Sequence, residues 1–244
     1  MTEALYLTET DRREFEATVE RTLDDRAVLD GTCFYPTGGG QPNDTGVLRA
    51  EGDEWRVTDV QKKDTVYHVL EPTSDDLPAT PAEGTTVAGV LDWERRFAHM
   101  RYHTAQHLLS ALLLAEYDAR TTGNQLYDDH AHLDCEYERF DDDDLGAIER
   151  RMNELVDDAR PVRWYTMDRE TAEETLDTDR TRIHLLPDSI TEVRIVEVGG
   201  DDQPYDRTAC AGTHVENTEA IGTVRVTGRE TKGRDEERVH FELE

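Results

Sequence analysis

The sequence changes its hydrophobic pattern at about residue 91, and this change constrains the fold more than any other feature. Before it, short strand-like runs such as "TTVAGVLDW" (85–93) alternate with turn residues. After it, apolar residues recur at helical spacing from Trp93 to Tyr117. Several short strands with turn residues between them predict a small β-barrel. We therefore expect a barrel domain at 1–91 and a second domain, with helices, at 92–244.

The second part predicts helices first and strands afterwards. A second amphipathic helix begins at the acidic run 141–144 and ends before Pro161. Strand-like runs lie at 161–167, 191–199, 222–230 and 238–243. This order indicates an α+β fold with two layers, in which one antiparallel sheet is covered by helices on one face. The Pro- and Asp-rich piece at 71–84 is interpreted as a long hairpin loop of the barrel, since another strand-like run follows it.

The charge balance is strongly acidic and extends along the whole chain. Lysine and arginine total 27 and aspartate and glutamate 56, so the formal net charge is −29. Only three of the basic residues are lysines, a composition typical of a surface adapted to molar salt. At about 1 M salt the Debye length is about 3 Å, which screens repulsion between polyanions. The acidic balance therefore does not exclude RNA as a partner.

Cysteine usage and hydropathy indicate a cytoplasmic protein. The three cysteines lie far apart and are odd in number, which argues against a disulfide framework. The N-terminal stretch is charged, and the sequence has no apolar run of about 18 residues. We expect a soluble protein without membrane contact, and we favour a monomer.

Two pairs of ligand-type residues predict a metal site. His103 and His107 lie four apart in the apolar run "MRYHTAQHLLSALLL" (100–114), so on a helix both imidazoles face the same side. Cys210 and His214 are again four apart, with a glycine between them that allows a tight turn. Three imidazoles and a thiolate suit Zn²⁺. Four protein ligands fit a closed structural site better than an open hydrolytic one, so both roles of the metal stay open.

The same segments resemble a known family, the editing domain of alanyl-tRNA synthetase and its free-standing relatives, the AlaX proteins. "RYHTAQHLLSAL" (101–112) is similar to the family's HxxxH helix, and "CAGTHVENTEAIG" (210–222) to its Cys-Gly-Gly-Thr-His-Val segment, with Ala211 in place of a glycine. "FYPTGGGQPNDTG" (34–46) resembles the glycine-rich segment of the accessory β-domain. "ETKGRDEERVHFEL" (230–243) resembles the closing strand pair, although it is acidic at 235–237, where the family tends to be basic.

The resemblance implies a fold, a cofactor and an activity. It implies a β-barrel followed by a two-layer α+β editing domain with one zinc ion. The implied zinc ligands are His103, His107, Cys210 and His214. The implied activity is hydrolysis in trans of mischarged tRNA(Ala), chiefly Ser-tRNA(Ala) and secondly Gly-tRNA(Ala). The chain leaves no room for an adenylate-forming core, so we expect an editing enzyme and not a ligase.

The substrate contacts follow from the same resemblance. A pocket that rejects alanine and accepts the larger serine must recognise the hydroxyl, and Thr121 is our candidate, with Thr122 as the alternative register. Gln41 is a candidate contact for the aminoacyl end or the terminal adenosine. Phosphate contacts require basic or backbone donor groups. We expect them from Arg101, Lys232, Arg238 and the loop glycines Gly39 and Gly40.

Three other functions compete with editing. The first is a zinc-stabilised RNA-binding module without catalysis. The second is a peptidyl-tRNA ester hydrolase, because Gly39-Gly40-Gln41 also occurs in release factors. The third is a metalloprotease, which is disfavoured because the HxxxH motif has no glutamate after its first histidine.

Overall fold

The computed structural model describes residues 1–176, 181, 183, 186–187, 189–200 and 204–244. Within these residues the chain divides into two compact units, Met1–His99 and Met100–Glu244. The domain boundary predicted between 91 and 92 falls at the end of strand β8 (Thr86–Leu91), just before helix α1 (Trp93–Tyr117) begins. The domain limits themselves stay a prediction.

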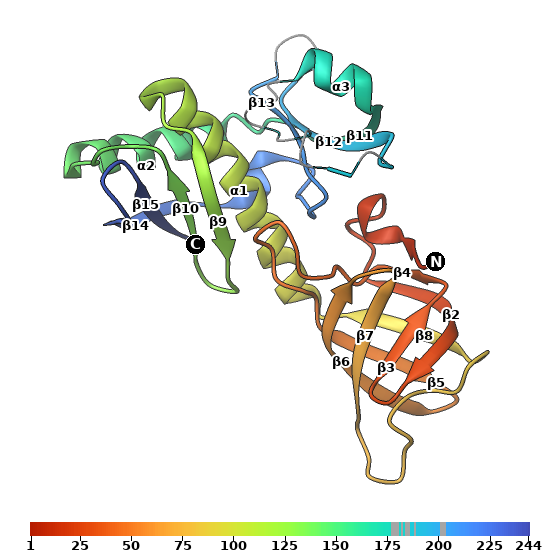
Figure 1. Ribbon diagram of the computed structural model, residues 1–244. Coiled ribbons are helices and arrows are strands. Elements are labelled where there is room, and N and C mark those ends of the chain that lie inside the picture. The colour runs from red at the N-terminus through yellow and green to blue at the C-terminus, as the bar shows by residue number, and fades with distance from the viewer. Residues whose placement is uncertain (177–180, 182, 184–185, 188, 201–203) are drawn as a thin grey trace. The chain divides into compact units, whose positions relative to one another are not determined.

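The first unit contains a closed six-stranded barrel (Figure 1). Its strands are β2 (Glu14–Leu23), β3 (Arg26–Leu29), β5 (Gly46–Ala50), β6 (Asp53–Lys62), β7 (Val66–Pro72) and β8. They close in the order β2-β3-β7-β6-β5-β8, and all of the pairings are antiparallel. Two short strands, β1 (Glu3–Ala4) and β4 (Gly31–Thr32), pair in parallel, and the 3-10 helix η1 (Leu5–Leu7) follows β1. The predicted barrel is confirmed.

The barrel interior is apolar and tightly packed. Alternate residues of β2, among them Phe15 and Val19, point into this core, as the period of two in a strand requires. Gly89 gives Phe15 its space, because a Cβ atom on Gly89 would lie 2.4 Å from the Phe15 ring. One imidazole is buried in the same unit: His68 Nδ1 donates to Ala27 O at 3.2 Å, and Thr32 Oγ1 lies 2.8 Å from Nε2.

The connection at 71–84 is not the hairpin loop that we predicted. It joins β7 to β8, but β7 pairs with β3 and β6, whereas β8 pairs with β2 and β5. The segment therefore leads to a non-neighbouring strand of the barrel. It is anchored where Trp55 Nε1 donates to Pro78 O at 2.9 Å.

The second unit contains two sheets and the greater part of α1. The four-stranded antiparallel sheet has the order β14-β15-β10-β9, and one of its faces is covered by α1 and α2 (Figure 1). Its strands are β9 (Thr121–Leu126), β10 (Ala131–Cys135), β14 (Val224–Thr231) and β15 (Glu237–Leu243). Tyr102 of α1 packs against Phe241 of β15, with ring centroids 5.9 Å apart.

Helix α2 (Asp142–Asp157) begins where the acidic run predicted it. Asp141 accepts a hydrogen bond from Asp144 N at 2.9 Å, and Asp141 N donates to the Asp144 carboxylate at 3.0 Å, which forms a capping box. Farther along the helix, Asn153 bonds both Val224 N and Val224 O. Helix α2 thus binds backbone groups of the edge strand β14, which would otherwise be unpaired.

The remaining strands form a second sheet, in the order β11-β12-β13, and not part of one common sheet as we predicted. They are β11 (Val162–Asp168), β12 (Glu192–Val198) and β13 (Asp206–Ala209), and helix α3 (Arg169–Thr175) packs on one face (Figure 1). A 3-10 helix, η3 (Thr218–Ile221), precedes β14. The α+β class is confirmed. Of the helices in the described ranges, none is long and apolar enough to cross a membrane.

Candidate metal centre

The predicted HxxxH pair lies in the middle of α1. His103 and His107 are buried, with 3% and 7% of their surface exposed, and their ring centroids are 5.4 Å apart. This is the geometry expected for residues four apart on one helical face. Four of the five leucines of the same run, Leu108, Leu109, Leu112 and Leu113, are buried elsewhere on the helix. The helix therefore packs with its apolar side chains and presents two imidazoles in one direction.

The second pair, in the loop after β13, meets the first. Cys210 Sγ lies 3.5 Å from His103 Nε2 and 3.4 Å from His214 Nε2, and the His103 and His214 ring centroids are 4.5 Å apart. The four ligand atoms, one from each residue, all lie within 4.8 Å of one another. Tetrahedral ligands at zinc-type bond lengths stand about 3.5 Å apart. The four residues together could hold a metal ion.

Two outer contacts orient the imidazoles. His107 Nδ1 donates to Asp206 Oδ2 at 2.7 Å, with Thr208 Oγ1 at 3.2 Å from the same nitrogen. His214 Nδ1 lies 3.3 Å from Thr104 Oγ1. A hydrogen bond from Nδ1 leaves the lone pair on Nε2, the nitrogen that faces the cluster. The sequence analysis missed Asp206, although an acidic residue four positions before Cys210 was a signal that could have identified it.

A third contact shapes the ligand loop. Arg194 Nη1 donates to Cys210 O at 2.8 Å and to Gly212 O at 3.0 Å, while Gly212 N donates to Cys210 Sγ at 3.3 Å. The Arg194 guanidinium also lies 5.6 Å from the ring centroid of Trp164. Arg194 therefore holds the backbone that carries two of the ligands. No pattern in the sequence singled it out, because its role depends on the pairing of β12 with β13.

The electrostatics of the cluster favour a thiolate. Burial raises the pKa of the Cys210 thiol, but the charges of His103 and His214 and hydrogen bonds from the imidazoles outweigh it, so that the pKa is well below its usual value. Burial and the charge of His103 lower the pKa of His214. Burial lowers the pKa of His107, yet Asp206 and Cys210 raise it to about 9. Such mutual charge stabilisation is expected where several ligand groups share one space.

The two candidate pocket threonines point to different partners. Thr121 Oγ1 lies 2.7 Å from Ser110 Oγ, which is three residues beyond His107 on α1. Thr122 Oγ1 donates instead to Glu236 Oε1 at 2.7 Å, in the turn between β14 and β15. Adjacent residues of a strand face opposite sides. Of the two, Thr121 is the one bonded to α1, and which of them is the pocket residue stays a prediction.

The glycine-rich loop belongs to the first unit. Gly38 and Gln41 exchange two backbone hydrogen bonds of 3.0 Å, and Gly39 and Gly40 have φ angles of 59° and 81°, which favour glycine. Gln41 is fully buried. The loop is anchored where Tyr35 N donates to the Asp44 carboxylate at 2.6 Å. The segment 38–41 thus forms a tight loop, and its contact with the substrate stays a prediction.

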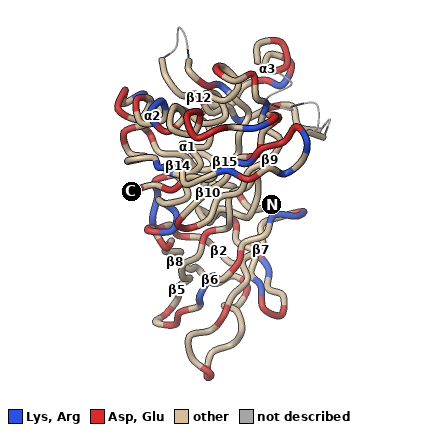
Figure 2. Tube along the Cα trace, turned by 90° about the vertical axis from the view of Figure 1, so that its left-hand side faces the viewer, with Lys and Arg blue, Asp and Glu red and all other residues tan. Residues whose placement is uncertain are grey.

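The three basic candidates for tRNA contacts all make bonds within the protein. Arg101 donates to Ile221 O at 2.7 Å and to Glu244 O at 2.8 Å. Arg238 forms a bidentate ion pair with Asp134, in which Nε lies 2.6 Å from Oδ1 and Nη2 lies 2.9 Å from Oδ2. Lys232 Nζ is 3.6 Å from a Glu230 oxygen. In Figure 2, acidic segments recur over both units, with basic segments between them.

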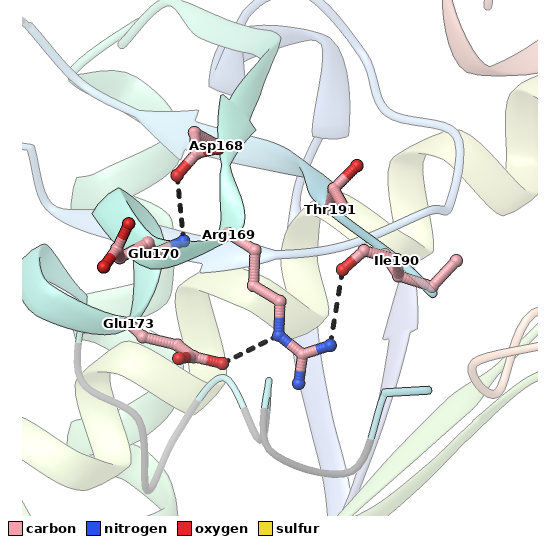
Figure 3. Close-up of a pocket in the computed structure, with 6 residues that line it drawn as sticks. All are labelled: Asp168, Arg169, Glu170, Glu173, Ile190 and Thr191. Carbon is pink, nitrogen blue, oxygen red and sulfur yellow. Dashed lines mark hydrogen bonds and ion pairs between the residues drawn. The ribbon is translucent and has the colours of Figure 1, made fainter. Parts of the chain in front are cut away.

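A pocket in the second unit lies beside the start of α3 (Figure 3). It is lined by Asp168, Arg169, Glu170, Glu173, Ile190 and Thr191. The Arg169 side chain donates to Glu173 at 2.8 Å and to the carbonyl oxygens of Pro187 and Ile190 at 2.8 and 3.3 Å. Because these bonds anchor the backbone, Arg169 has a structural role. None of the predicted site residues lines this pocket.

Comparisons with known proteins agree with this architecture. Residues 2–95 match the family described as tRNA synthetases class II (A), and residues 193–240 match the threonyl and alanyl tRNA synthetase second additional domain. The chain is 42% identical to the alanyl-tRNA editing protein AlaX-M of Methanosarcina barkeri, over 100% of this chain and 99% of that protein. It is 38% identical to the AlaX-M protein of Methanosarcina acetivorans, over 100% and 99%. The alanine–tRNA ligase of Pyrococcus furiosus is also 38% identical, over 98% of this chain but 26% of the ligase.

The resemblance predicted from the motifs is confirmed, and the chain belongs to the family of alanyl-tRNA editing proteins AlaX-M.

Proposed function

We propose that the protein is a trans-editing enzyme that deacylates mischarged tRNA(Ala), chiefly Ser-tRNA(Ala) and secondly Gly-tRNA(Ala). One observation carries the proposal: a chain related to AlaX-M proteins over its full length brings the buried His103, His107 and His214 and the half-buried Cys210 together in one cluster. Because the substrate takes part in translation, we place the activity in the cytoplasm.

Zinc is the metal that we propose for this cluster. Three imidazole nitrogens and one thiolate form the N/S donor set that Zn²⁺ prefers in four-coordinate sites. When bound, Zn²⁺ would supply a fixed positive charge that orients the aminoacyl end of the substrate. Four protein ligands leave no open position for a hydroxide, so the protein residues around the substrate have to position the attacking water.

The protein residues have three tasks in this proposal. Thr121, held beside α1 by Ser110, recognises the seryl hydroxyl. Gln41 of the glycine-rich loop is proposed to contact the aminoacyl end or the terminal adenosine, although its side chain is fully buried in this structure. The aminoacyl bond is an activated ester, so a positioned water and stabilisation of the developing negative charge suffice for hydrolysis. A site with paired polar groups for a hydroxyl discriminates against the analogue without it by about 10⁴ to 10⁵.

For the tRNA backbone we propose Lys232, Arg238, Arg101, Gly39 and Gly40 as contacts. The three side chains are not equivalent. Arg101 already donates to two carbonyl oxygens, and Arg238 is paired with Asp134. Lys232 has the longest and weakest of these contacts, at 3.6 Å. We therefore expect Lys232 to contribute most to phosphate binding.

The direct test is a deacylation assay at high salt. Ser-tRNA(Ala), Gly-tRNA(Ala) and Ala-tRNA(Ala) are incubated with the wild-type protein and with the His107→Ala variant. We expect fast release of serine, slower release of glycine and retention of alanine, with serine release at least about tenfold slower in the variant. Release by the wild type at the rate of buffer alone would favour the RNA-binding module instead.

A further inference from the structure

Helix α1 carries one continuous polar strip. His103, Gln106, His107 and Ser110 are spaced as i, i+3, i+4 and i+7, so they lie on the same helical face. At one end of the strip are the two predicted metal ligands. At the other end Ser110 Oγ contacts Thr121 Oγ1 at 2.7 Å. Gln106 lies between His103 and His107 along the helix, and neither the sequence motifs nor the proposed function gives it a role.

Gln106 differs from its polar neighbours on this strip in its hydrogen bonding. Only 8% of its surface is exposed. Its side-chain carbonyl oxygen is buried and has no hydrogen-bond partner among the residues that the structure describes. An unpaired buried acceptor lowers stability, and such groups are rare in native proteins. A hydrophobic residue would fill the position without this penalty. The carbonyl is therefore suited to a donor that arrives with a ligand.

We propose that the Gln106 carbonyl accepts a hydrogen bond from the hydroxyl of the seryl group, and that Gln106 is thus a specificity-determining residue for deacylation. The inference rests on the proposed function, because it assumes a seryl ester beside the cluster. A seryl group brings the missing donor, whereas an alanyl group leaves the carbonyl unpaired. Gln106 and Ser110 are four apart and stack on one face, so Gln106 and the Ser110–Thr121 pair recognise the same substituent together.

The test is the Gln106→Met variant, which keeps the side-chain length and removes the carbonyl. We expect kcat/KM for Ser-tRNA(Ala) to fall about 10- to 100-fold, the loss for one unmade hydrogen bond to a buried partner. The rate for Gly-tRNA(Ala) should stay within about twofold, because glycine has no hydroxyl. Thermal unfolding should occur at the same or a higher Tm, since an unpaired buried acceptor is removed. Gln125→Met, on β9, is the matched control and should change none of these values.

A binding measurement tests the role of Gln106 without relying on catalytic activity. Stable 3′-seryl-amide and 3′-alanyl-amide analogues of adenosine are titrated calorimetrically into zinc-loaded wild type, Gln106→Met and Gln106→Leu. We expect the wild type to prefer the seryl analogue at least about tenfold and both variants to lose most of that preference. The Gln106→Leu variant controls for a packing defect that only methionine would cause.

Four results would overturn the inference. Equal losses for the seryl and glycyl substrates would mean that Gln106 binds the ammonium group common to both. A lower Tm together with an unchanged serine rate would mean that Gln106 is only structural. A wild type that releases no serine would overturn the proposed function and this inference with it, whereas an active wild type matched by Gln106→Met would overturn this inference alone.

Discussion

Two buried polar clusters, one in each unit, differ in where their charges and lone pairs are directed. In the first unit, the guanidinium of Arg96 is fully buried against the carboxylate of Asp44, with Nε 3.0 Å from both oxygens. Its other donors bond Thr10 O and Cys33 O. Positive and negative charge are matched within the protein. The cluster in the second unit instead directs three imidazoles and one thiol at the same space.

This difference separates a structural site from a ligand site. A buried ion pair with its hydrogen bonds satisfied needs nothing from outside. The four ligand groups, whose atoms all lie within 4.8 Å of one another, are three imidazoles and one thiolate, a donor set that a single cation can satisfy. Arg96 therefore fixes the position of the glycine-rich loop through Asp44, whereas His103 and its neighbours could hold a metal ion. The four predictions that follow test each side of this comparison.

The largest effect should come from metal removal. Because the ligands converge only in the folded chain, zinc binding is linked to folding. We expect a strong chelator to lower the stability of the second unit by about 5 kcal/mol or more, and added zinc to restore it. Calorimetric unfolding with and without the chelator measures this. An unchanged unfolding profile would mean that the cluster is held by its own hydrogen bonds.

The second largest effect should come from breaking the buried Arg96–Asp44 ion pair. Arg96→Met leaves the Asp44 carboxylate buried without its partner, so we expect a loss of about 3 to 5 kcal/mol in unfolding free energy, while zinc content is unchanged. Arg95→Met is the matched control, since Arg95 is only half-buried and makes a 3.2 Å bond to Asn43 O. Denaturant titration distinguishes the two, and equal losses would contradict the structural role of Arg96.

His68 gives the first unit a dependence on pH. Burial lowers its pKa from 6.5 to about 4, although the bond to Ala27 O opposes the shift. Between these values the unfolded chain binds a proton that the folded chain does not, so stability falls as the pH falls from 6.5 towards 4, by up to about 3 kcal/mol. Denaturation of the wild type and of His68→Gln across this range isolates the contribution. Parallel curves for the two proteins would show that His68 is not its source.

The smallest effect should come from weakening the hydrogen bond between Asp206 and His107, one of the four predicted ligands. Asp206→Asn weakens the hydrogen bond that orients His107, and we expect zinc affinity to fall about 10- to 100-fold. Glu197→Gln is the control, because Glu197 lies on the opposite face of the same sheet, where it pairs with Arg207. Competition with a chromophoric chelator reports the affinity. A loss shared by both variants would indicate a general defect of the sheet.

Sequence reasoning succeeded where the signal was local. The helix predicted from Trp93 to Tyr117 has these ends in the structure, because its apolar spacing and its side-chain directions are properties of one segment. The same holds for the convergence of His103 with His107. Their meeting with Cys210 was predictable because both halves had the spacing of metal ligands.

The failures involve contacts distant in sequence. The strands at 161–167 and 191–199 were expected in one sheet with 222–230 and 238–243, yet they form a second sheet. Strand pairing depends on packing, which hydrophobic spacing does not encode. The sequence also did not predict that Arg101 bonds Ile221 O, 120 residues away, while its predicted contact with phosphate stays a prediction. Charge alone does not reveal which cations are already paired.

The most direct test of the central claim is the zinc content of the intact protein. Native mass spectrometry of the wild type should show one zinc ion per chain, and the double variant His103→Ala/Cys210→Ala, which loses one ligand from each half, should show none. The Arg96→Met variant should keep its zinc, because Arg96 pairs with Asp44 in the first unit and is not one of the four predicted ligands. Equal zinc content in the wild type and the double variant would contradict the account.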